Sequence, residues 1–494
     1  MSETAFRLEE ATIASVHEAM QKGEVTCQML VEGYLKRIEA YDQKGPKLNA
    51  VVCVNPKALA EARQLDEKFK SGGFVGPLHG IPVLLKDNVD TFDMATTGGS
   101  ASLEGFVPED DAFITEKFRE AGALILAKVN LHEFAIWGET ISSILGQTVN
   151  PYDSTRTPGG SSGGTGAGIA ANFGMVGIGT DTINSIRSPG SANNLVGFRP
   201  TIGLVSRDGI VPYSFTQDTA GPITRTVEDA VKVLDVIAGY DKTDDETAWS
   251  VGKKPETYTA FLDKDGLKGK RIGVLESFFG TDAIHEDINK AVRKGIEEMR
   301  KGGASVIEIK EDIDSGYLVS KVSVHFNDLK DHLNIYLNAL PERAPVHSVE
   351  EVLASGKYHP GIEENLKKAM ALSVGTPEYN ERLVKRTALQ TQVMKLMADY
   401  ELDAIVYPHQ KQLVCLIGKS QDERNGVLGS VTGFPSIAVQ AGFSTPTETA
   451  PIGVPIGMEI LGRPWSEPTL IEIAYGFEQS TNNRRLPQST PPIV

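Results

Sequence analysis

The stretch GMVGIGTDTINSIRSPGS, residues 174–191, joins an apolar run to a polar turn that contains a proline. Residues 174–180 predict a buried strand, because a short apolar run bounded by turn residues is typical of one. Asp181, Ser185 and Arg187 follow, so an acid, a small hydroxyl and a cation arrive together at the end of that strand. Local packing does not require this combination, and we therefore predict that the turn has a chemical role.

Similar apolar runs recur along the chain and alternate with segments of helical spacing. The runs predict strands at residues 81–85, 123–129, 174–180, 271–275, 305–309, 403–408, 436–442 and 457–462. The spacing predicts helices at residues 110–121, 164–172, 226–239, 285–302 and 467–480. Thr226 is the expected N-cap of its helix, with Asp229 three residues later. Such alternation predicts an α/β protein.

Composition places the chain among ordinary globular proteins. It has 494 residues, of which 40% are hydrophobic and 23% charged. A length prior of roughly 150 residues per domain suggests about three domains, yet no linker, low-complexity tract or internal repeat marks a boundary. The formal net charge of -16 favours solubility and argues against nonspecific binding to nucleic acid or to an anionic membrane.

Three features predict a cytoplasmic protein. The N-terminal segment MSETAFRLEEATIASVHEAMQKGE carries acids where a secretory signal has a basic segment. No stretch approaches the roughly 20 apolar residues of a membrane span. Cys27, Cys53 and Cys415 are too few for a disulfide framework and sit among apolar residues, so we interpret them as small buried side chains in a reducing compartment.

Two earlier segments are also unlike ordinary scaffold. GIPVLLKDNVDT, residues 80–91, ends an apolar run in Lys86. RTPGGSSGGTGAGIAA, residues 156–171, packs glycines around Ser161 and Ser162. Glycine at this density is costly unless the backbone turns sharply or approaches another group closely. We therefore expect this loop to serve a site.

Two alternative chemistries fit the glycine-rich loop less well. A P-loop needs a lysine followed by serine or threonine after its last glycine, whereas Gly164 is followed by Thr165 and Gly166. The loose match GAGIAA, residues 166–171, lacks the preceding strand that a dinucleotide-binding unit requires. A Ser-His-Asp hydrolase of the G-x-S-x-G type lacks its elbow here, and we interpret the best histidine candidate, His132, as structural.

A lysine and serines remain as the reactive groups. Lysine deprotonates a hydroxyl only when it is neutral, which requires a site where burial or nearby cations disfavour its charge. Lys86 follows the apolar run IPVLL, where such burial is expected. We therefore predict that Lys86 is the base of a serine-dependent reaction.

The three segments together resemble the signature of the amidase signature family of Ser-Ser-Lys amide hydrolases. Lys86, Ser161 and Ser185 occur in the order and with the spacing that this family shows. The likeness continues through NLHEFAIWGETISSILGQTVNPYD, VGFRPTIGLVSRDGIVP and PIGMEILGRPW. It is closest to peptide amidases and related bacterial and fungal amidases.

The resemblance implies one large domain over residues 1–494, with a twisted mixed β-sheet covered by helices on both faces. The catalytic core is expected at residues 70–240 and 400–482. Residues 241–400 are the least informative, and we expect a helical, variable region there.

The resemblance also implies a role for each of the three residues. Ser185 would attack an amide carbonyl and form an acyl-enzyme. Ser161, which a cis peptide bond holds in this family, would pass protons between Ser185 and Lys86, the general base and later the general acid. Neither step requires a metal or another cofactor, and the cysteines and histidines show no zinc-site spacing.

The oxyanion formed during attack needs fixed donors, which the backbone N–H groups of Thr182, Ile183, Asn184 and Ser185 would supply. The family usually has two glycines directly before the nucleophile, where this sequence has Ile183 and Asn184. Asn tolerates a left-handed backbone, whereas Ile requires an ordinary one. Because backbone donors depend on conformation and not on side chains, we expect activity to survive. A catalytically impaired homologue is the alternative.

Other residues are expected to support or shape the site. Asp181 and Arg187 would brace the turn through hydrogen bonds and a partly buried ion pair, and Ser162 would be a supporting hydroxyl. An acyl pocket has apolar candidates that are equally candidates for core packing: Phe134, Trp137, Ile141, Phe215 and Trp465.

Several functions stay open at this point. The wording GLVSRDGIVP and DTAGP favours a stand-alone amidase that acts on a small-molecule amide and releases ammonia or an amine. The family also includes the glutamine-hydrolysing subunit of a tRNA-dependent amidotransferase, which works in a complex, and a purely structural protein is a third alternative. We expect neither nucleic acid nor a membrane as a partner, and both a monomer and a homodimer fit the sequence.

Overall fold

A long mixed β-sheet runs through the molecule, in a computed structural model that describes residues 6–493. Its strands are β1 Val51–Val54, β2 Pro82–Lys86, β3 Leu124–Val129, β6 Val176–Asp181, β7 Val196–Arg199, β8 Thr219–Thr224, β9 Arg271–Leu275, β10 Ser305–Ile309, β11 Ala404–Pro408, β12 Ser436–Phe443 and β13 Pro455–Leu461. The 11 strands lie in the order β1-β3-β2-β6-β8-β7-β12-β13-β11-β9-β10. A separate ribbon pairs β4 Ile141–Ser142 with β5 Gly146–Gln147.

The eight strands predicted from apolar runs are all present, with small differences at their ends. The sequence does not predict β1, β7 and β8. The first two are short strands of 4 residues each, and β8 contains the turn formers Gly221 and Pro222. These two residues give β8 the composition of a turn, although β8 is a strand that pairs with β6 along its whole length.

The helices include the five that were predicted, which appear as α4, α5, α7, α8 and α15. The α-helices of the described chain are α1 Ile13–Gln21, α2 Cys27–Tyr41, α3 Ala58–Gly72, α4 Phe113–Glu120, α5 Gly163–Ala170, α6 Arg187–Ala192, α7 Val227–Ile237, α8 Glu286–Lys301, α9 Ser315–Tyr317, α10 His325–Ala339, α11 Val349–Ser355, α12 Glu363–Met370, α13 Pro377–Asp399, α14 Val427–Thr432 and α15 Glu467–Thr481, besides short 3-10 turns and a π-helical turn at Leu318–Val322. Thr226 caps α7 as predicted, because its Oγ1 accepts a hydrogen bond from Asp229 N at 3.2 Å.

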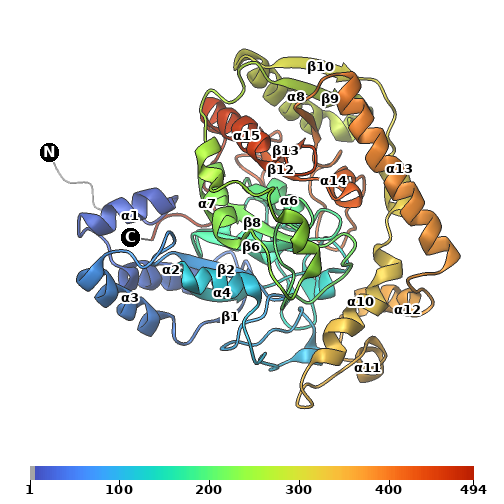
Figure 1. The fold of residues 1–494 in the computed structure, drawn as a ribbon. Coiled ribbons are helices and arrows are strands. Elements are labelled where there is room, and N and C mark those ends of the chain that lie inside the picture. Colours follow the sequence, from blue (N-terminus) through green and yellow to red (C-terminus); the bar gives the residue numbers. More distant parts are fainter. Residues whose placement is uncertain (1–5, 494) are drawn as a thin grey trace.

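Helices cover both faces of the sheet, as the resemblance implied (Figure 1). The short helices α5 and α6 pack on the central strands, while α7, α8 and α15 pack on strands of the same sheet as a separate group. The chain between residues 241 and 400 adds β9 and β10 to this sheet. It also forms α10, α11 and α12, which gather at one corner in Figure 1, and α13, which runs along one side.

The sheet brings two of the predicted segments together at one edge. The neighbouring strands β2 and β6 are parallel, with Val83 opposite Val176 and Leu85 opposite Ile178. Parallel strands end at the same edge of a sheet, which is where open α/β sheets bind their ligands. Lys86 therefore ends beside the turn that follows β6.

The interior is built as the apolar runs predict. β2, β3 and β6 are buried along their whole length, and the large apolar side chains among them belong to the main hydrophobic core. Across residues 6–493, no helix combines the length and the hydropathy needed to cross a bilayer.

Candidate active site

The Lys86 amine lies between two hydroxyl groups at the end of β2. Its Nζ lies 2.7 Å from Ser161 Oγ and 2.7 Å from Thr180 Oγ1. Thr180 comes from β6 and also accepts a hydrogen bond from Asn88 Nδ2 at 3.1 Å. The side chain of Lys86 is wholly buried, as the apolar run before it predicted.

Burial changes the protonation of this lysine. It lowers the pKa of Lys86 from 10.5 to about 7, while the carboxylates of Asp218 and Asp181 oppose the change only in part. A large fraction of the amine is therefore neutral near pH 7 and able to accept a proton. Ser161 Oγ lies within hydrogen-bond distance of this amine.

Ser161 lies in the glycine-rich loop before α5. The peptide bond between Gly160 and Ser161 is cis, as the resemblance implied. Gly159 has a φ of +70°, which residues with side chains rarely adopt, and a Cβ on Gly164 would lie 2.3 Å from the carbonyl oxygen of Asn130. Sharp turning and close packing thus account for the density of glycine.

One backbone contact and one side chain with two hydrogen bonds hold this loop in place. His132 N donates to Ser161 O at 2.9 Å. Thr140 Oγ1 donates to Gly159 O at 2.7 Å and accepts from Gly163 N at 3.0 Å. Thr140 therefore fastens both sides of the cis peptide, a role that no local sequence signal indicates.

Ser185 lies in the turn between β6 and α6, and 5% of its surface is exposed. Its carbonyl oxygen accepts a hydrogen bond from Ser162 N at 3.3 Å, which ties the turn to the glycine-rich loop. Ser162 Oγ donates to Thr180 O at 3.2 Å. Ser185 Oγ forms no hydrogen bond with another residue of the described chain, so this hydroxyl is left available to a ligand.

Four consecutive backbone N–H groups in this turn are without a partner inside residues 6–493: those of Thr182, Ile183, Asn184 and Ser185. The four preceding carbonyl groups, in contrast, each accept a hydrogen bond. These bonds join Asp181 O to Arg199 Nη1 (2.6 Å), Thr182 O to Gln217 Nε2 (3.0 Å), Ile183 O to Arg187 Nη2 (2.9 Å) and Ser430 Oγ (2.5 Å), and Asn184 O to Ser188 N (2.7 Å).

The anchored carbonyls fix the direction of the donors. In a trans peptide the C=O of one residue and the N–H of the next point to opposite sides of the chain. Each carbonyl bond therefore turns the following N–H away from the protein groups that hold the carbonyl. The same four residues line a cavity, so the turn presents a row of donors to whatever occupies it.

The two residues that replace the expected glycines fit this turn without a left-handed backbone. Neither Ile183 nor Asn184 has a positive φ. Ile183 keeps the ordinary conformation that the sequence required of it, and Asn184 does not use its tolerance for the left-handed region. The Ile183 side chain packs into a hydrophobic cluster with Val427 and Leu428 of α14. Side chains at these positions are therefore compatible with the row of donors.

A buried charge network holds the turn from behind. Arg187 Nη2 lies 3.0 Å from Asp181 Oδ1, and Arg199 Nη1 lies 2.8 Å from the same oxygen. Burial opposes the charge on Asp181, but these two guanidinium groups hold the pKa of its carboxyl well below the usual range. Arg187 also pairs with Glu459, and 0% of each side chain is exposed. The predicted ion pair is thus fully buried rather than partly buried.

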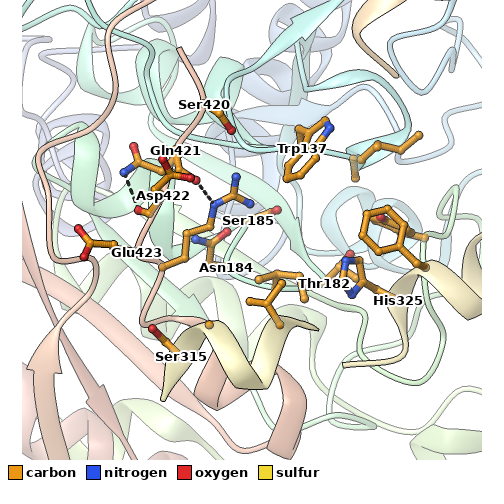
Figure 2. A pocket seen from close by; sticks show the side chains of 18 residues that line it. Trp137, Thr182, Asn184, Ser185, Ser315, His325, Ser420, Gln421, Asp422 and Glu423 are labelled. Atoms are coloured by element: carbon orange, nitrogen blue, oxygen red, sulfur yellow. Dashed lines mark hydrogen bonds between the residues drawn. The ribbon is translucent and has the colours of Figure 1, made fainter. Parts of the chain in front are cut away.

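The cavity beside Ser185 has a volume of about 280 Å³. Figure 2 shows Ser185 and Asn184 near its centre, with Trp137 and His325 on one side and the segment from Ser420 to Glu423 on the other. Apolar lining comes from Ile136, Trp137, Val319 and Phe326. The cavity therefore offers an apolar wall facing a row of polar donors.

The five candidates for an acyl pocket divide among different places. Trp137 lines the cavity beside Ser185, and Phe215 lines a smaller one with Thr182 and Asp218. Ile141 lines a neighbouring cavity of about 390 Å³ that shares Trp137. Phe134 and Trp465 pack in or against hydrophobic clusters. Of the five, only Trp137 lies where it would meet a ligand of Ser185.

The best histidine candidate has a structural environment. His132 is buried, and its Nδ1 accepts a hydrogen bond from Glu139 N at 3.2 Å. Burial lowers the pKa of His132 to about 3, so the ring is neutral. Of the cysteines, Cys27 is buried, whereas Cys53 and Cys415 are partly exposed. Within residues 6–493, no group of three or more His, Cys, Asp or Glu side chains is placed to hold a metal ion.

Sequence reasoning missed several residues that support the site, most of which come from other segments of the chain. Thr180 contacts Lys86, while Arg199, Gln217 and Ser430 hold carbonyl groups of the turn. Thr180 had a usable signal, because it is polar at the end of an apolar strand. The others approach from segments distant in sequence, and nothing in their neighbourhood indicates the contact.

Comparisons with known proteins find relatives along nearly the whole chain. The family model described as Amidase matches residues 29–471. A probable amidase of Arabidopsis thaliana is 35% identical over 505 residues, which cover 98% of this chain and 93% of the plant protein. A glutamyl-tRNA(Gln) amidotransferase subunit from Thermoanaerobacter pseudethanolicus is 33% identical over 495 residues, 97% of this chain and 98% of that one. Among solved structures, the native peptide amidase from Stenotrophomonas maltophilia has a TM-score of 0.88 and 37% identity, and the match covers 98% of this chain and 99% of that chain.

Proposed function

Since the chain belongs to the amidase family and is an amide-hydrolysing enzyme, we propose that it cleaves a carboxamide C–N bond through an acyl-enzyme on Ser185. Ser161 and Lys86 complete the catalytic group. The observation that carries the proposal is the 2.7 Å contact between Lys86 Nζ and Ser161 Oγ beside the accessible Ser185. This contact joins Lys86, a base of lowered pKa, to the hydroxyl of Ser161. Ser161 lies in the glycine-rich loop, and Ser185 is hydrogen-bonded to the same loop.

Acylation begins with proton transfer along the three residues. Neutral Lys86 accepts the proton of Ser161 Oγ while Ser161 accepts the proton of Ser185 Oγ. The Ser185 oxygen attacks the amide carbonyl, and the carbonyl oxygen takes the negative charge. Lys86 then returns the proton through Ser161 to the leaving nitrogen, so ammonia or an amine departs and an ester on Ser185 remains.

Deacylation repeats the sequence with water. Water gives a proton to the same relay and attacks the ester carbonyl, and the Ser185 oxygen recovers a proton as it leaves. Splitting amide cleavage into two steps replaces one high barrier with two lower ones. All proton transfers are carried out by side chains of the chain itself.

The row of backbone donors supplies the remaining part of the catalysis. A negatively charged oxygen held by fixed N–H groups of Thr182, Ile183, Asn184 and Ser185 is stabilised by a few kcal/mol in comparable sites. The fixed carbonyl contacts support this role, because the donors need no rearrangement during the reaction. Their presence favours an active enzyme over an impaired homologue.

The substrate class is tested with a panel of purified amides. The panel comprises small primary amides, anilides and peptide C-terminal amides, and release of ammonia or amine is measured. We expect turnover of at least one class by the isolated chain, with preference for an apolar acyl part because of the wall around Trp137. Absence of turnover across the panel would contradict the stand-alone enzyme.

An amidotransferase component is the second candidate, supported by the relative from Thermoanaerobacter pseudethanolicus. A component of this kind would hydrolyse glutamine and show little activity without its partner chains. Size-exclusion chromatography of the native protein, followed by a glutamine-dependent ammonia assay on each fraction, separates the two. A stand-alone amidase elutes as a monomer or homodimer that carries the full activity.

The pH dependence of turnover follows from the state of Lys86. Only the neutral amine accepts a proton, and its pKa is about 7. Lowering the pH protonates the base, so kcat/KM is expected to rise with pH up to about 7 and to level off above it, with roughly a tenth of the plateau one pH unit below the pKa. Initial rates at low substrate concentration measure this profile. A flat profile across this range would exclude Lys86 as the base.

Chelation is expected to leave the activity unchanged. The proposed steps use only side chains and backbone groups, so no divalent ion takes part in any of them. Dialysis against EDTA, followed by the amide assay with and without added divalent ions, measures the effect. Activity that disappears on dialysis and returns with one specific ion would overturn the mechanism.

A further inference from the structure

A buried glutamine connects the turn that carries the backbone donors, residues 182–185 (the oxyanion turn), to a wall of the cavity. Gln217 Nε2 donates to Thr182 O at 3.0 Å, and its Oε1 accepts from Val324 N at 2.9 Å. Because one partner is a backbone acceptor and the other a backbone donor, the orientation of the amide is fixed. Gln217 also receives a contact of 2.9 Å from Ser323 Oγ at the same Oε1. The side chain is wholly buried.

Ser323 extends this contact to His325. Ser323 Oγ lies 2.6 Å from His325 Nδ1. An amide oxygen only accepts, so the single Ser323 hydroxyl proton goes to Gln217 Oε1, and His325 Nδ1 must donate to Ser323 Oγ. Burial lowers the pKa of His325 to about 3. The ring is therefore neutral, with its proton on Nδ1 and a lone pair on Nε2.

The His325 end of this series of hydrogen bonds faces the cavity. His325 begins α10 and lines the same cavity as Ser185, where Figure 2 places it beside Thr182. The His325 ring stands edge-on to Tyr213 at 5.5 Å between centres, which fixes its plane. No residue of the described chain donates to Nε2. The cavity end is thus an acceptor, which an amide N–H of a substrate satisfies.

We propose that His325, Ser323 and Gln217 form a hydrogen-bonded chain in which Gln217 positions the oxyanion turn and His325 accepts a hydrogen bond from a substrate N–H. The proposal rests on the proposed function, because it concerns the donors that hold the oxyanion. Anchoring of Thr182 O directs the Ile183 N–H to the opposite side of the chain. Hydrogen bonds in series polarise one another, so a substrate bound at His325 strengthens the contact at Thr182.

Gln217→Leu tests the positioning role, since leucine has a similar volume and forms no hydrogen bond. We expect kcat on a primary amide to fall roughly 10- to 100-fold with less than about a threefold change in KM, because donors aimed at the transition state are disturbed. A fluorophosphonate end-point titration should still label about one site per chain. A kcat within about twofold of the native enzyme, or a loss explained by fewer labelled sites, would overturn the proposal.

Gln217→Glu covers the case in which the leucine variant does not fold. Glutamate keeps the acceptor toward Val324 N and Ser323, and it loses the N–H that holds Thr182 O. We expect it to lose kcat to a similar extent, because only the contact to the turn is broken. A native kcat in this variant would contradict the positioning role.

His325→Phe tests the connection itself. We expect this variant to lower kcat/KM about tenfold, the loss that one hydrogen bond typically causes. In the double variant with Gln217→Leu, kcat/KM should fall by less than the product of the two single losses, since the series is already broken. Losses that multiply would show that the two residues act independently.

Gln440→Leu is the matched control. Gln440 is a buried glutamine in β12 whose Nε2 donates to Arg225 O at 3.2 Å, outside the cavity. We expect it to keep the native kcat per labelled site.

The native enzyme and Ser185→Ala, assayed beside these variants, separate the proposed function from this inference. An inactive native enzyme contradicts the proposed function. An active native enzyme together with an unaffected Gln217→Leu contradicts only this inference.

Discussion

Lys86→Ala is expected to lower kcat roughly 10³-fold or more near neutral pH. A positioned general base contributes about 10² to 10⁴, and here it also supplies the proton for the leaving group. No other titratable side chain contacts Ser161 Oγ in the described chain, since its hydrogen bond is with Lys86 Nζ. Steady-state release of ammonia, corrected for the fraction of folded protein, measures the loss.

Lys86→Arg is the matched variant for charge and length. Its guanidinium stays protonated at every accessible pH, so it cannot act as a base, and we expect nearly the same loss. This outcome separates a base from a residue that only contributes a positive charge. Native-like turnover by either variant would exclude the assignment of Lys86.

Ser185→Ala is expected to remove turnover almost completely, by roughly 10⁵-fold or more, as loss of the nucleophile does in comparable serine hydrolases. The substitution removes one hydroxyl that makes no hydrogen bond to another described residue, so we expect the fold to be kept. The matched control is Ser191→Ala in α6, whose Oγ accepts from Gly457 N of β13 at 2.9 Å. It should keep most of the activity.

The two serine variants are compared in the same amide assay and by thermal unfolding. A Ser185→Ala enzyme that retains a substantial fraction of native turnover would require a different nucleophile. Equal losses in Ser185→Ala and Ser191→Ala, accompanied by equal losses of stability, would indicate damage to the turn instead of removal of a reacting atom.

The sequence predicts the fold well wherever a strand is an uninterrupted apolar run. β2 and β6 are such runs. Strands of a sheet that is buried on both faces have continuous apolar sequences, which is why these two are recognisable. β8 could not be found in this way, because Gly221 and Pro222 give it the composition of a turn. Its strand conformation depends on pairing with β6, which is a contact between distant segments.

The site was predictable to the extent that its chemistry lies in short segments. Lys86 and the glycine-rich loop carry their own local signals, an apolar run and a cluster of glycines. Ser430 and Glu459 carry none, because each reaches the turn from a remote part of the chain. What the sequence cannot give is the direction in which Ser430 and Gln217 point.

Ile183 and Asn184 show the difference between a residue pattern and a backbone requirement. Glycines at these positions suggest a left-handed backbone, yet neither residue has a positive φ. The turn is kept by hydrogen bonds to its carbonyl groups, which any side chain permits if space is available. The replacement of two glycines therefore does not by itself indicate lost activity.

Labelling with a fluorophosphonate, followed by peptide mapping by mass spectrometry, tests the central claim most directly. The reagent bonds to the oxygen that attacks and places its own oxygen among the backbone donors of the turn. We predict an adduct on Ser185 in the native enzyme, none in Ser185→Ala, and slow labelling of Ser185 in Ser161→Ala, since loss of the relay slows proton transfer but keeps the nucleophile. An adduct on Ser161 or Ser162, or undiminished labelling of Ser185→Ala, would contradict it.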